Sequence, residues 1–184
     1  YNTCGLNGVD NSNSYIKNIK SILNQKFEDK KIVFSGNHIP PAILKKVYDE
    51  FKNDISYCLT NDRLAVNQTF NHSVLKSVDA YGDFDGYMYV ASDVSFSDDL
   101  ESLGRLNERL KNSENGIISP EIDKDNGYYW WFNFDESKNL WDVASRDKDF
   151  VVPLGATANL HCKIFSNKIF KEYGRPLPDI FVSY

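Results

Sequence analysis

The stretch KKIVFSGNHIPPAILKKVYDEFKNDISYCLT (residues 30–60) decides the fold class. It opens with a short apolar run that stops at Gly36, and a second apolar run closes it over 54–60. Between the two runs, a pair of prolines starts a segment whose apolar residues share one helical face: Ile43, Leu44, Val47 and Phe51. A strand, a helix and another strand of these lengths predict two parallel strands joined by a crossover helix.

The same alternation continues on both sides of this unit. Apolar residues recur at helical spacing from Tyr15 to Phe27 and predict an amphipathic helix from Asn13 onward, for which Asn13 or Ser14 can serve as the N-cap. Further along, the pattern predicts a helix over about 64–78, a strand over 86–92 and a helix over 97–110. Short apolar strands between helices indicate a doubly wound α/β fold, with a mostly parallel sheet covered on both faces.

Beyond about residue 113 the pattern changes. Three apolar segments, GIISPEI, GYYWWFNF and FVVPLG, are separated by charged, turn-rich sequence with no crossover helix between most of them. They predict antiparallel or mixed additions to the sheet. One more helix, about Asn167–Tyr173, is expected to stop at Gly174. We expect one domain over 1–184, and a longer parent chain because Tyr1 already has the character of a strand interior.

Composition excludes several classes of protein. The 184 residues are 41% hydrophobic and carry a net charge of −5, and the lysines are scattered, so nucleic acid is not an expected partner. No apolar run approaches the roughly 20 residues of a membrane-spanning helix. Three distant cysteines without metal-ligand spacing predict reduced thiols and a cytoplasmic protein.

A single carboxylate follows the strand in YVASDVSF (residues 89–96). Open α/β sheets bind ligands beyond the carboxyl ends of their strands, which favours Asp93 over Asp83 and Asp85, the Asp-x-Asp pair that precedes this strand. Asp93 is either a ligand for a divalent cation that carries a diphosphate, or a cap for the helix expected from Ser97. The residues alone support both interpretations equally.

Other candidate groups are less specific. The aromatic run around Trp130 can stack on sugar rings or can simply pack into the core. His161, near the end of a predicted strand, can reach a phosphate or metal, although a structural histidine is the default interpretation. The sequence contains no nucleophile elbow, Walker loop or dinucleotide glycine fingerprint, which counts against a hydrolase or an NAD enzyme.

Four segments together resemble a known family: YN at the start, SILNQKFED, KIVFSG and YVASDVSF. They are similar to the nucleotide-binding half of family 2-type glycosyltransferases with the GT-A fold, a Rossmann-like mixed, mostly parallel sheet with helices on both faces. They further resemble the small glycosyltransferase domains of large algal DNA viruses (chloroviruses), which implies capsid glycan synthesis in the host cytoplasm. The resemblance implies transfer of a sugar from a nucleoside diphosphate donor, with Mn²⁺ or Mg²⁺, to a glycan or glycoprotein acceptor.

The resemblance also implies a nucleotide site. Ser35 and Asn37 fall where many relatives have a base-contacting Asp, which leaves the base open although uracil is the common one. The Asp-x-Asp position reads Ala91-Ser92-Asp93, so Asp93 would hold the metal nearly alone, or no metal binds. The full nucleotide set implied in this way is Tyr1, Asn2, Thr3, Ser35, Asn37, Arg63, Asn67, Ser92 and Asp93.

The same resemblance divides the chain into a donor half (about 1–112) and an acceptor half (about 113–184). The residues expected near the donor or acceptor sugar are Trp130, Gly155, Asn159 and His161. The family's general base would fall at or just after Tyr184, and Asp179 is the nearest acid before it.

Two alternatives remain from the sequence. A sugar nucleotidyltransferase would need a basic glycine-rich phosphate loop, but NTCGLNGVDNSNS has no Lys or Arg. A catalytically degenerate module that binds nucleotide sugars or carbohydrate fits the missing first acid. The donor sugar, the acceptor, the stereochemical outcome and the oligomeric state stay open.

Overall fold

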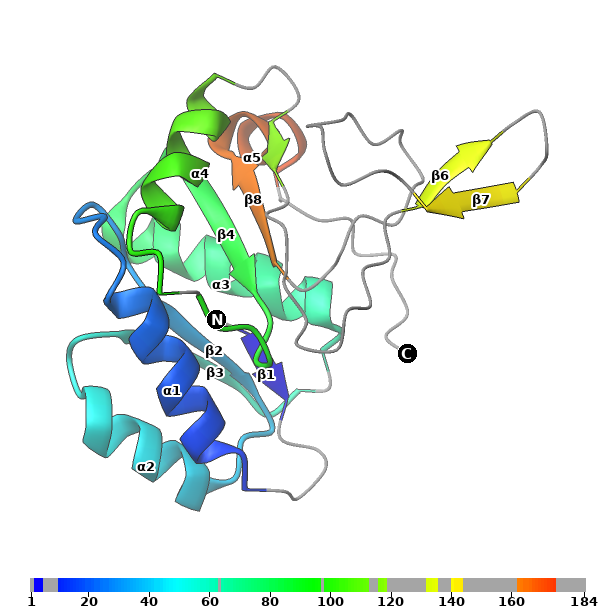
Figure 1. Cartoon of the computed structure of the whole chain (residues 1–184). Helices are drawn as coiled ribbons and strands as arrows, with labels where there is room; N and C mark the ends of the chain where they lie inside the picture. Colours follow the sequence, from blue (N-terminus) through cyan, green and yellow to red (C-terminus); the bar gives the residue numbers. More distant parts are fainter. Residues whose placement is uncertain are drawn as a thin grey trace.

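A computed structural model describes residues 2–4, 10–62, 64–96, 98–112, 116–118, 132–135, 140–143 and 162–174, the side chains of 2–4, 132–135 and 140–143 excepted. Helices and strands alternate along the first two thirds of this part (Figure 1). The elements are β1 (Asn2–Cys4), α1 (Ser12–Leu23), β2 (Val33–Asn37), α2 (Pro41–Phe51), β3 (Ser56–Thr60), α3 (Val66–Tyr81), β4 (Gly86–Val90), α4 (Ser102–Lys111), β5 (Ile117–Ile118), β6 (Phe132–Asp135), β7 (Leu140–Val143), β8 (Cys162–Ser166) and α5 (Asn167–Tyr173).

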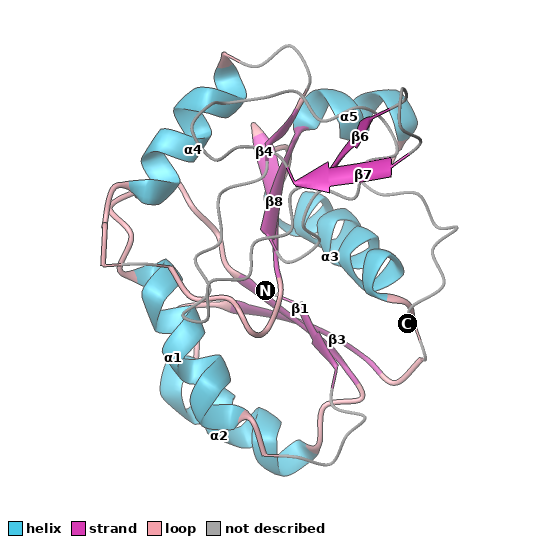
Figure 2. Ribbon diagram, turned by 45° about the vertical axis from the view of Figure 1, so that its right-hand side comes forward, coloured by secondary structure: helices cyan, strands magenta, loops and turns pink. Residues whose placement is uncertain are grey.

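A parallel sheet of order β1-β2-β3 forms the first layer. Helices α1 and α2 lie on one side of it and α3 on the other (Figure 2). Alternate side chains of β2 explain this arrangement, because Phe34 packs its ring 6.1 Å from Tyr15 of α1, whereas Ser35 accepts a hydrogen bond from Ser73 of α3. The strand is therefore covered on both faces, as its continuous apolar sequence predicts.

A second sheet, of order β4-β8-β5, is antiparallel. Helix α3 covers this sheet too: the ring of Phe70 lies 5.4 Å from that of Tyr89 on β4 and 5.7 Å from that of Phe165 on β8. The register places Lys163 opposite Tyr89. One helix thus ties both sheets together, and the chain has a mixed α/β structure with antiparallel additions, as expected.

The expected sheet is found only in part. The described parallel ladder ends at three strands, and the described partner of β4 is β8, which runs the other way. Apolar sequence predicts that a strand is buried but does not select its neighbour, and β8 lies some seventy residues further along the chain. β6 and β7 pair as an antiparallel hairpin, of which only β6 was anticipated. The predicted strand at 150–155 lies outside the described residues.

Several helix ends differ from expectation: α1 ends at Leu23 rather than near Phe27, and α3 spans Val66–Tyr81 rather than about 64–78. α1 begins at Ser12, whose backbone N–H is bound by the Asp10 carboxylate at 3.0 Å rather than by a cap at 13–14. α4 begins at Ser102 instead of 97; just before it, the Asp99 carboxylate accepts from the Glu101 N–H, and in its first turn the Leu103 N–H donates to the Gln25 side chain. α5 stops at Gly174, which takes the left-handed φ of +70° expected of a C-terminal glycine.

Candidate functional site

The carboxyl ends of the strands define a single edge of the molecule. β2 ends at Asn37 and β3 at Thr60, and these ends are tied together by the His38 N–H, which donates to the Thr60 carbonyl at 3.0 Å. β4 runs toward the same end as β2 (Figure 1) and finishes opposite Cys162, the first residue of β8. This is the edge at which an open α/β sheet binds ligands.

Asn37 presents a hydrogen-bond acceptor at this edge. Its side chain is 4% exposed, and its Nδ2 donates to the Leu64 carbonyl at 2.8 Å. Because the amide nitrogen must face that carbonyl, the orientation of the side chain is determined. The Oδ1 is buried and has no hydrogen-bond partner within the described part of the chain. A buried acceptor without a partner costs free energy, so this atom is a candidate ligand contact.

Ser35 and His38 lie near Asn37 in the sequence, but their side chains have different environments. Ser35 is fully enclosed and its hydroxyl is engaged by Ser73 at 2.5 Å, which makes it part of the packing between β2 and α3. His38 was not singled out by sequence. It has a left-handed φ of +52°, and its buried Nε2 lacks a partner among the described residues. Strained backbone of this kind clusters at binding sites.

Asp93 lies in a well-defined turn. The Val94 N–H donates to the Ala91 carbonyl at 3.1 Å, which places Ser92 and Asp93 at the centre of a four-residue turn directly after β4. The Asp93 side chain is exposed. Burial, and next the negative charge of Asp93, raise the pKa of the Tyr89 phenol to about 12.

The alternative role of Asp93 as a helix cap is wrong. α4 starts nine residues later, and its first amides have other partners: Asp99 accepts from the Glu101 N–H and Gln25 accepts from the Leu103 N–H, both at 3.1 Å. The Asp93 carboxylate is therefore not required to start that helix.

A turn with one carboxylate suits a cation that arrives with its own ligands. No cluster of three or more His, Cys, Asp or Glu side chains that could hold a metal ion exists within the described ranges. Mg²⁺ and Mn²⁺ commonly take one or two carboxylates and complete their shell with phosphate oxygens and water. Asp93 fits that pattern as a single protein ligand.

Lys163 is a second candidate site residue that the sequence did not predict. It faces the α3 side of its sheet, like Phe165, but lies two residues nearer the carboxyl end of β4. The residue is half-buried, burial lowers the pKa of its ammonium group, and no hydrogen bond or ion pair reaches it from the described residues. Its only signal in the sequence is a lysine inside the apolar strand HCKIF.

The remaining predicted residues divide into two groups. Asn67 is buried in the first turn of α3, close to Leu64 and thus to the same edge. Asn2 and Thr3 pair in register with Ser35 and Gly36, so their backbone lies beside β2. Several predicted residues lie outside the described part of the chain: Tyr1, Arg63, Trp130, Gly155, Asn159, His161 and Asp179.

The literal Asp-x-Asp belongs to the opposite end of β4. Asp83 forms an ion pair with Lys171 of α5 at 3.1 Å, and the Asp85 carbonyl accepts the Asn167 N–H at 2.9 Å. These contacts hold α5 against the start of β4. Asp83 and Asp85 thus precede β4 and Asp93 follows it, which is the difference in position on which the prediction for Asp93 was based.

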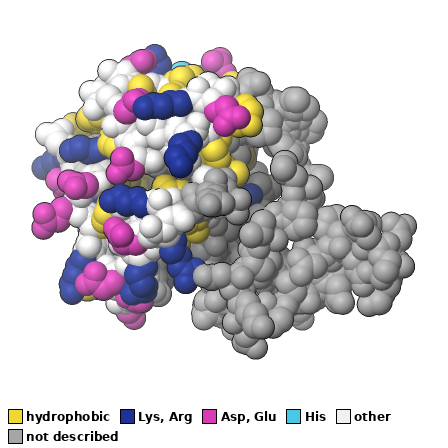
Figure 3. Space-filling model, turned by 90° about the horizontal axis from the view of Figure 1, so that it is seen from above, with side chains coloured by type: hydrophobic (Ala, Val, Ile, Leu, Met, Phe, Trp, Pro, Cys, Tyr) yellow, Lys and Arg dark blue, Asp and Glu magenta, His cyan; other side chains and the backbone are white. Residues whose placement is uncertain are grey.

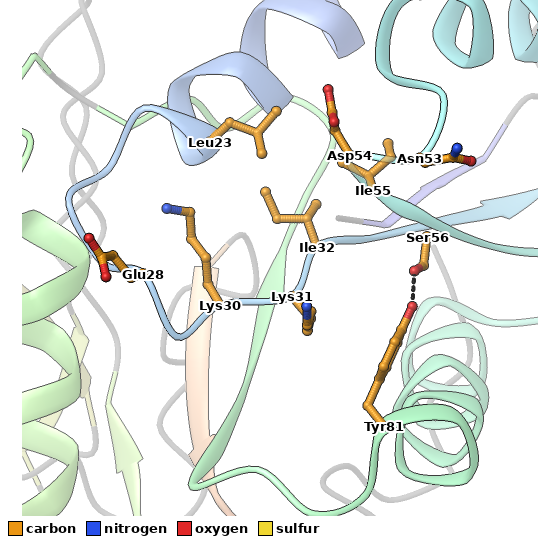
Figure 4. Close-up of a pocket in the computed structure, with 10 residues that line it drawn as sticks. All are labelled: Leu23, Glu28, Lys30, Lys31, Ile32, Asn53, Asp54, Ile55, Ser56 and Tyr81. Atoms are coloured by element: carbon orange, nitrogen blue, oxygen red, sulfur yellow. Dashed lines mark hydrogen bonds between the residues drawn. The ribbon is translucent and has the colours of Figure 1, made fainter.

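A hollow of about 230 Å³ also lies at the amino ends of the strands, away from the proposed edge (Figure 4). Its walls are held by structural contacts: Tyr81 meets the Ser56 hydroxyl, and Lys30 donates to the carbonyls of Gln25 and Phe27. Acidic and basic side chains are interspersed over the described face in Figure 3, without a basic patch on that face. None of the helices in the described part combines the length and apolarity needed to cross a bilayer.

Comparison with known proteins identifies the fold. No family model and no curated protein sequence matches the chain. Among solved structures, it is similar to the crystal structure of S. aureus TarS 1-349, a glycosyltransferase, with a TM-score of 0.56 and 13% identity over 95% of this chain and 50% of that one. The chain has a glycosyltransferase-like fold. It spans about half the length of the TarS chain it matches.

Proposed function

We propose that this chain is the donor-binding part of a GT-A, family 2-type glycosyltransferase. It would transfer a sugar from a nucleoside diphosphate sugar to a glycan or glycoprotein acceptor. The observation that carries this proposal is the turn that exposes Asp93 directly after β4, at the edge where Asn37 presents its acceptor. The likeness to TarS supports it at the level of fold. The acceptor and a role in viral capsid glycans rest on the sequence resemblance alone.

The base would be read by Asn37. One hydrogen of its Nδ2 is donated to the Leu64 carbonyl, and its buried Oδ1 is the acceptor that we expect to meet the base. Such an acceptor pairs with the ring N–H of uracil, thymine or guanine, whereas cytosine and adenine have acceptors at the equivalent ring positions and are disfavoured there. Uracil is the base that the family resemblance favours.

The diphosphate would be held by Asp93 through a divalent cation and by Lys163 directly. The cation supplies positive charge that stabilises the departing diphosphate as the sugar is transferred. Lys163 adds a further charge at the same edge, since its half-buried ammonium has no carboxylate partner among the described residues. Asp93 would hold the cation at the turn that follows β4.

Calorimetric titration of UDP, GDP, CDP and dTDP, each with and without Mn²⁺, tests the proposal. We expect UDP to bind and Mn²⁺ to increase its affinity, and we expect the Mn²⁺ effect to vanish in Asp93→Asn. Unchanged Mn²⁺-dependent affinity in that variant rejects the metal role of Asp93. Absence of binding by all four nucleotides rejects donor binding altogether.

A degenerate nucleotide-sugar-binding module is the second candidate, favoured by the lone acid at the Asp-x-Asp position. Both candidates bind UDP, but only a transferase is expected to break the bond between sugar and diphosphate. Slow hydrolysis of a UDP-sugar in the presence of Mn²⁺, lost in Asp93→Asn, supports the enzyme. Tight binding without any turnover supports the module.

A further inference from the structure

The segment that joins β4 to α4 is hydrogen-bonded to one face of α1 and to the turn that follows α1. The Asn18 Nδ2 donates to the Ser92 carbonyl at 2.8 Å, and the Phe96 N–H donates to the Ser21 hydroxyl at 2.8 Å. Further on, Gln25 donates to the Asp99 carbonyl and accepts from the Leu103 N–H, both at 3.1 Å. Asn18 and Ser21 lie three residues apart on one face of α1, and Gln25 lies in the turn after the helix ends at Leu23. We call Asn18, Ser21 and Gln25 the α1 brace.

Burying polar side chains such as those of the α1 brace costs folding free energy that apolar side chains would not lose. Asn18 is 5% exposed and lies beside Ile19 and Ile22 in the main core, where an apolar side chain would bury its surface without losing hydration. Three of the four bonds go to backbone atoms of this segment and the fourth to a backbone amide in the first turn of α4, so together they specify where the main chain runs. Buried polar contacts of this kind lower the stability gained from packing, but they fix the position of the backbone to which they bind.

The two bonds nearest β4 enclose the Asp93 turn. Asn18 holds the carbonyl of Ser92, which directly precedes Asp93, and Ser21 holds the amide of Phe96, three residues after it. Within the described ranges no group of three or more His, Cys, Asp or Glu side chains could hold a metal ion, so the site proposed around Asp93 depends on where this turn places its carboxylate. A shift of about 1 Å in such a group is enough to disable a site.

We propose that Asn18 and Ser21 are positioning residues of the donor site, which hold the Asp93 turn where the cation-bound diphosphate of the donor meets it. This inference rests on the proposed function. It also assigns a physical task to the SILNQ segment, in which Ser21 and Gln25 bind the chain that follows β4 rather than the ligand.

Ser21→Ala and Ser77→Ala form a matched pair for the test. Both serines donate to a carbonyl of their own helix at 2.7 Å, Ser21 to Asn18 and Ser77 to Ser73, but only Ser21 also accepts the N–H of the segment after β4. Ser21→Thr keeps the hydroxyl, and Asn18→Asp keeps the shape while it replaces the donor by a charged acceptor.

The measurements are UDP affinity with and without Mn²⁺, and hydrogen exchange of the Phe96 amide. We expect Ser21→Ala and Asn18→Asp to reduce the gain in affinity from Mn²⁺ about fivefold, the factor that one hydrogen bond contributes, and to leave metal-free affinity unchanged. The Phe96 amide should exchange faster in Ser21→Ala. Ser21→Thr should restore both properties, and Ser77→Ala should alter neither.

The measurements distinguish a failure of the positioning role from a failure of the proposed function. If the wild-type protein binds UDP with a Mn²⁺ gain that Ser21→Ala and Asn18→Asp retain, the positioning role is wrong and the proposed function stands. If both variants weaken binding equally with and without Mn²⁺, the brace is merely structural and the inference is overturned. If the wild-type protein binds UDP with no Mn²⁺ gain, the inference fails together with the metal role of Asp93. If it binds no UDP, the proposed function fails first.

Discussion

Gln25→Glu tests the brace through stability, because it changes one atom of a buried amide. Gln25 is 2% exposed; its Oε1 accepts from the Leu103 N–H and its Nε2 donates to the Asp99 carbonyl. The glutamate keeps the first bond but turns an oxygen toward the Asp99 carbonyl. The loss of that bond and the desolvation of the new charge together should lower the free energy of unfolding by about 3 kcal/mol at pH 8.

The loss should shrink at low pH. Burial and the facing carbonyl raise the pKa of the new carboxyl in the folded state above its value of about 4.3 in the unfolded chain. A raised folded pKa means that the native state holds the proton more tightly, so stability falls as pH rises through this interval. At pH 4, the protonated carboxyl can donate to the Asp99 carbonyl and recover most of the lost stability.

Urea unfolding of wild type and variant at several pH values between 4 and 8 measures the effect. Gln68→Glu is the matched control, because Gln68 acts there as an acceptor: its Oε1 binds the Ala65 N–H at the start of α3. A negative charge at a helix N-terminus is favourable, so this variant should be at least as stable as wild type at pH 8. A Gln25→Glu penalty that is absent or independent of pH refutes the reasoning.

Three further predictions concern other parts of the structure. Lys163→Gln should weaken UDP binding about tenfold and leave uridine binding unchanged, because only UDP carries phosphates. Lys168→Gln, on the exposed face of α5, is the control and should change the affinity for neither ligand. Equal losses of UDP and uridine affinity in Lys163→Gln would contradict a phosphate contact. The folded pKa of Tyr89, about 12, lies above its ordinary value near 10, so the unfolded state loses its proton first as pH rises. Wild type should therefore lose about 2 kcal/mol of stability between pH 10 and 12 that Tyr89→Phe does not lose, as measured by urea unfolding. Gly36→Ala should destabilise by about 1–3 kcal/mol, because the nearest side-chain carbon would lie 2.6 Å from the added Cβ; Gly104→Ala, with open space in α4, should stabilise by about 1 kcal/mol, and thermal unfolding compares the two.

Features that depend on neighbours in sequence were predictable. The apolar spacing of α1 and α2 is complete within a dozen residues, and Gly174 ends α5 because its own backbone adopts the left-handed conformation. The placement of Asp93 after the carboxyl end of β4 followed from strand direction alone. The start of α4 was not predictable from periodicity, since its first turn also depends on the side chain of Gln25, which lies 78 residues away from Leu103 in the sequence.

The sequence by itself determined that strands alternate with helices, that β2 is buried on both faces, and that one acid follows β4. Tertiary structure alone decided that β4 pairs with β8, that Lys163 comes opposite Tyr89, and that Asn18 and Ser21 hold the turn of Asp93. The physical reason is separation along the chain. The bonds of Asn18 and Ser21 span 74 and 75 residues, and no local pattern encodes which distant carbonyl or amide a buried polar side chain will meet.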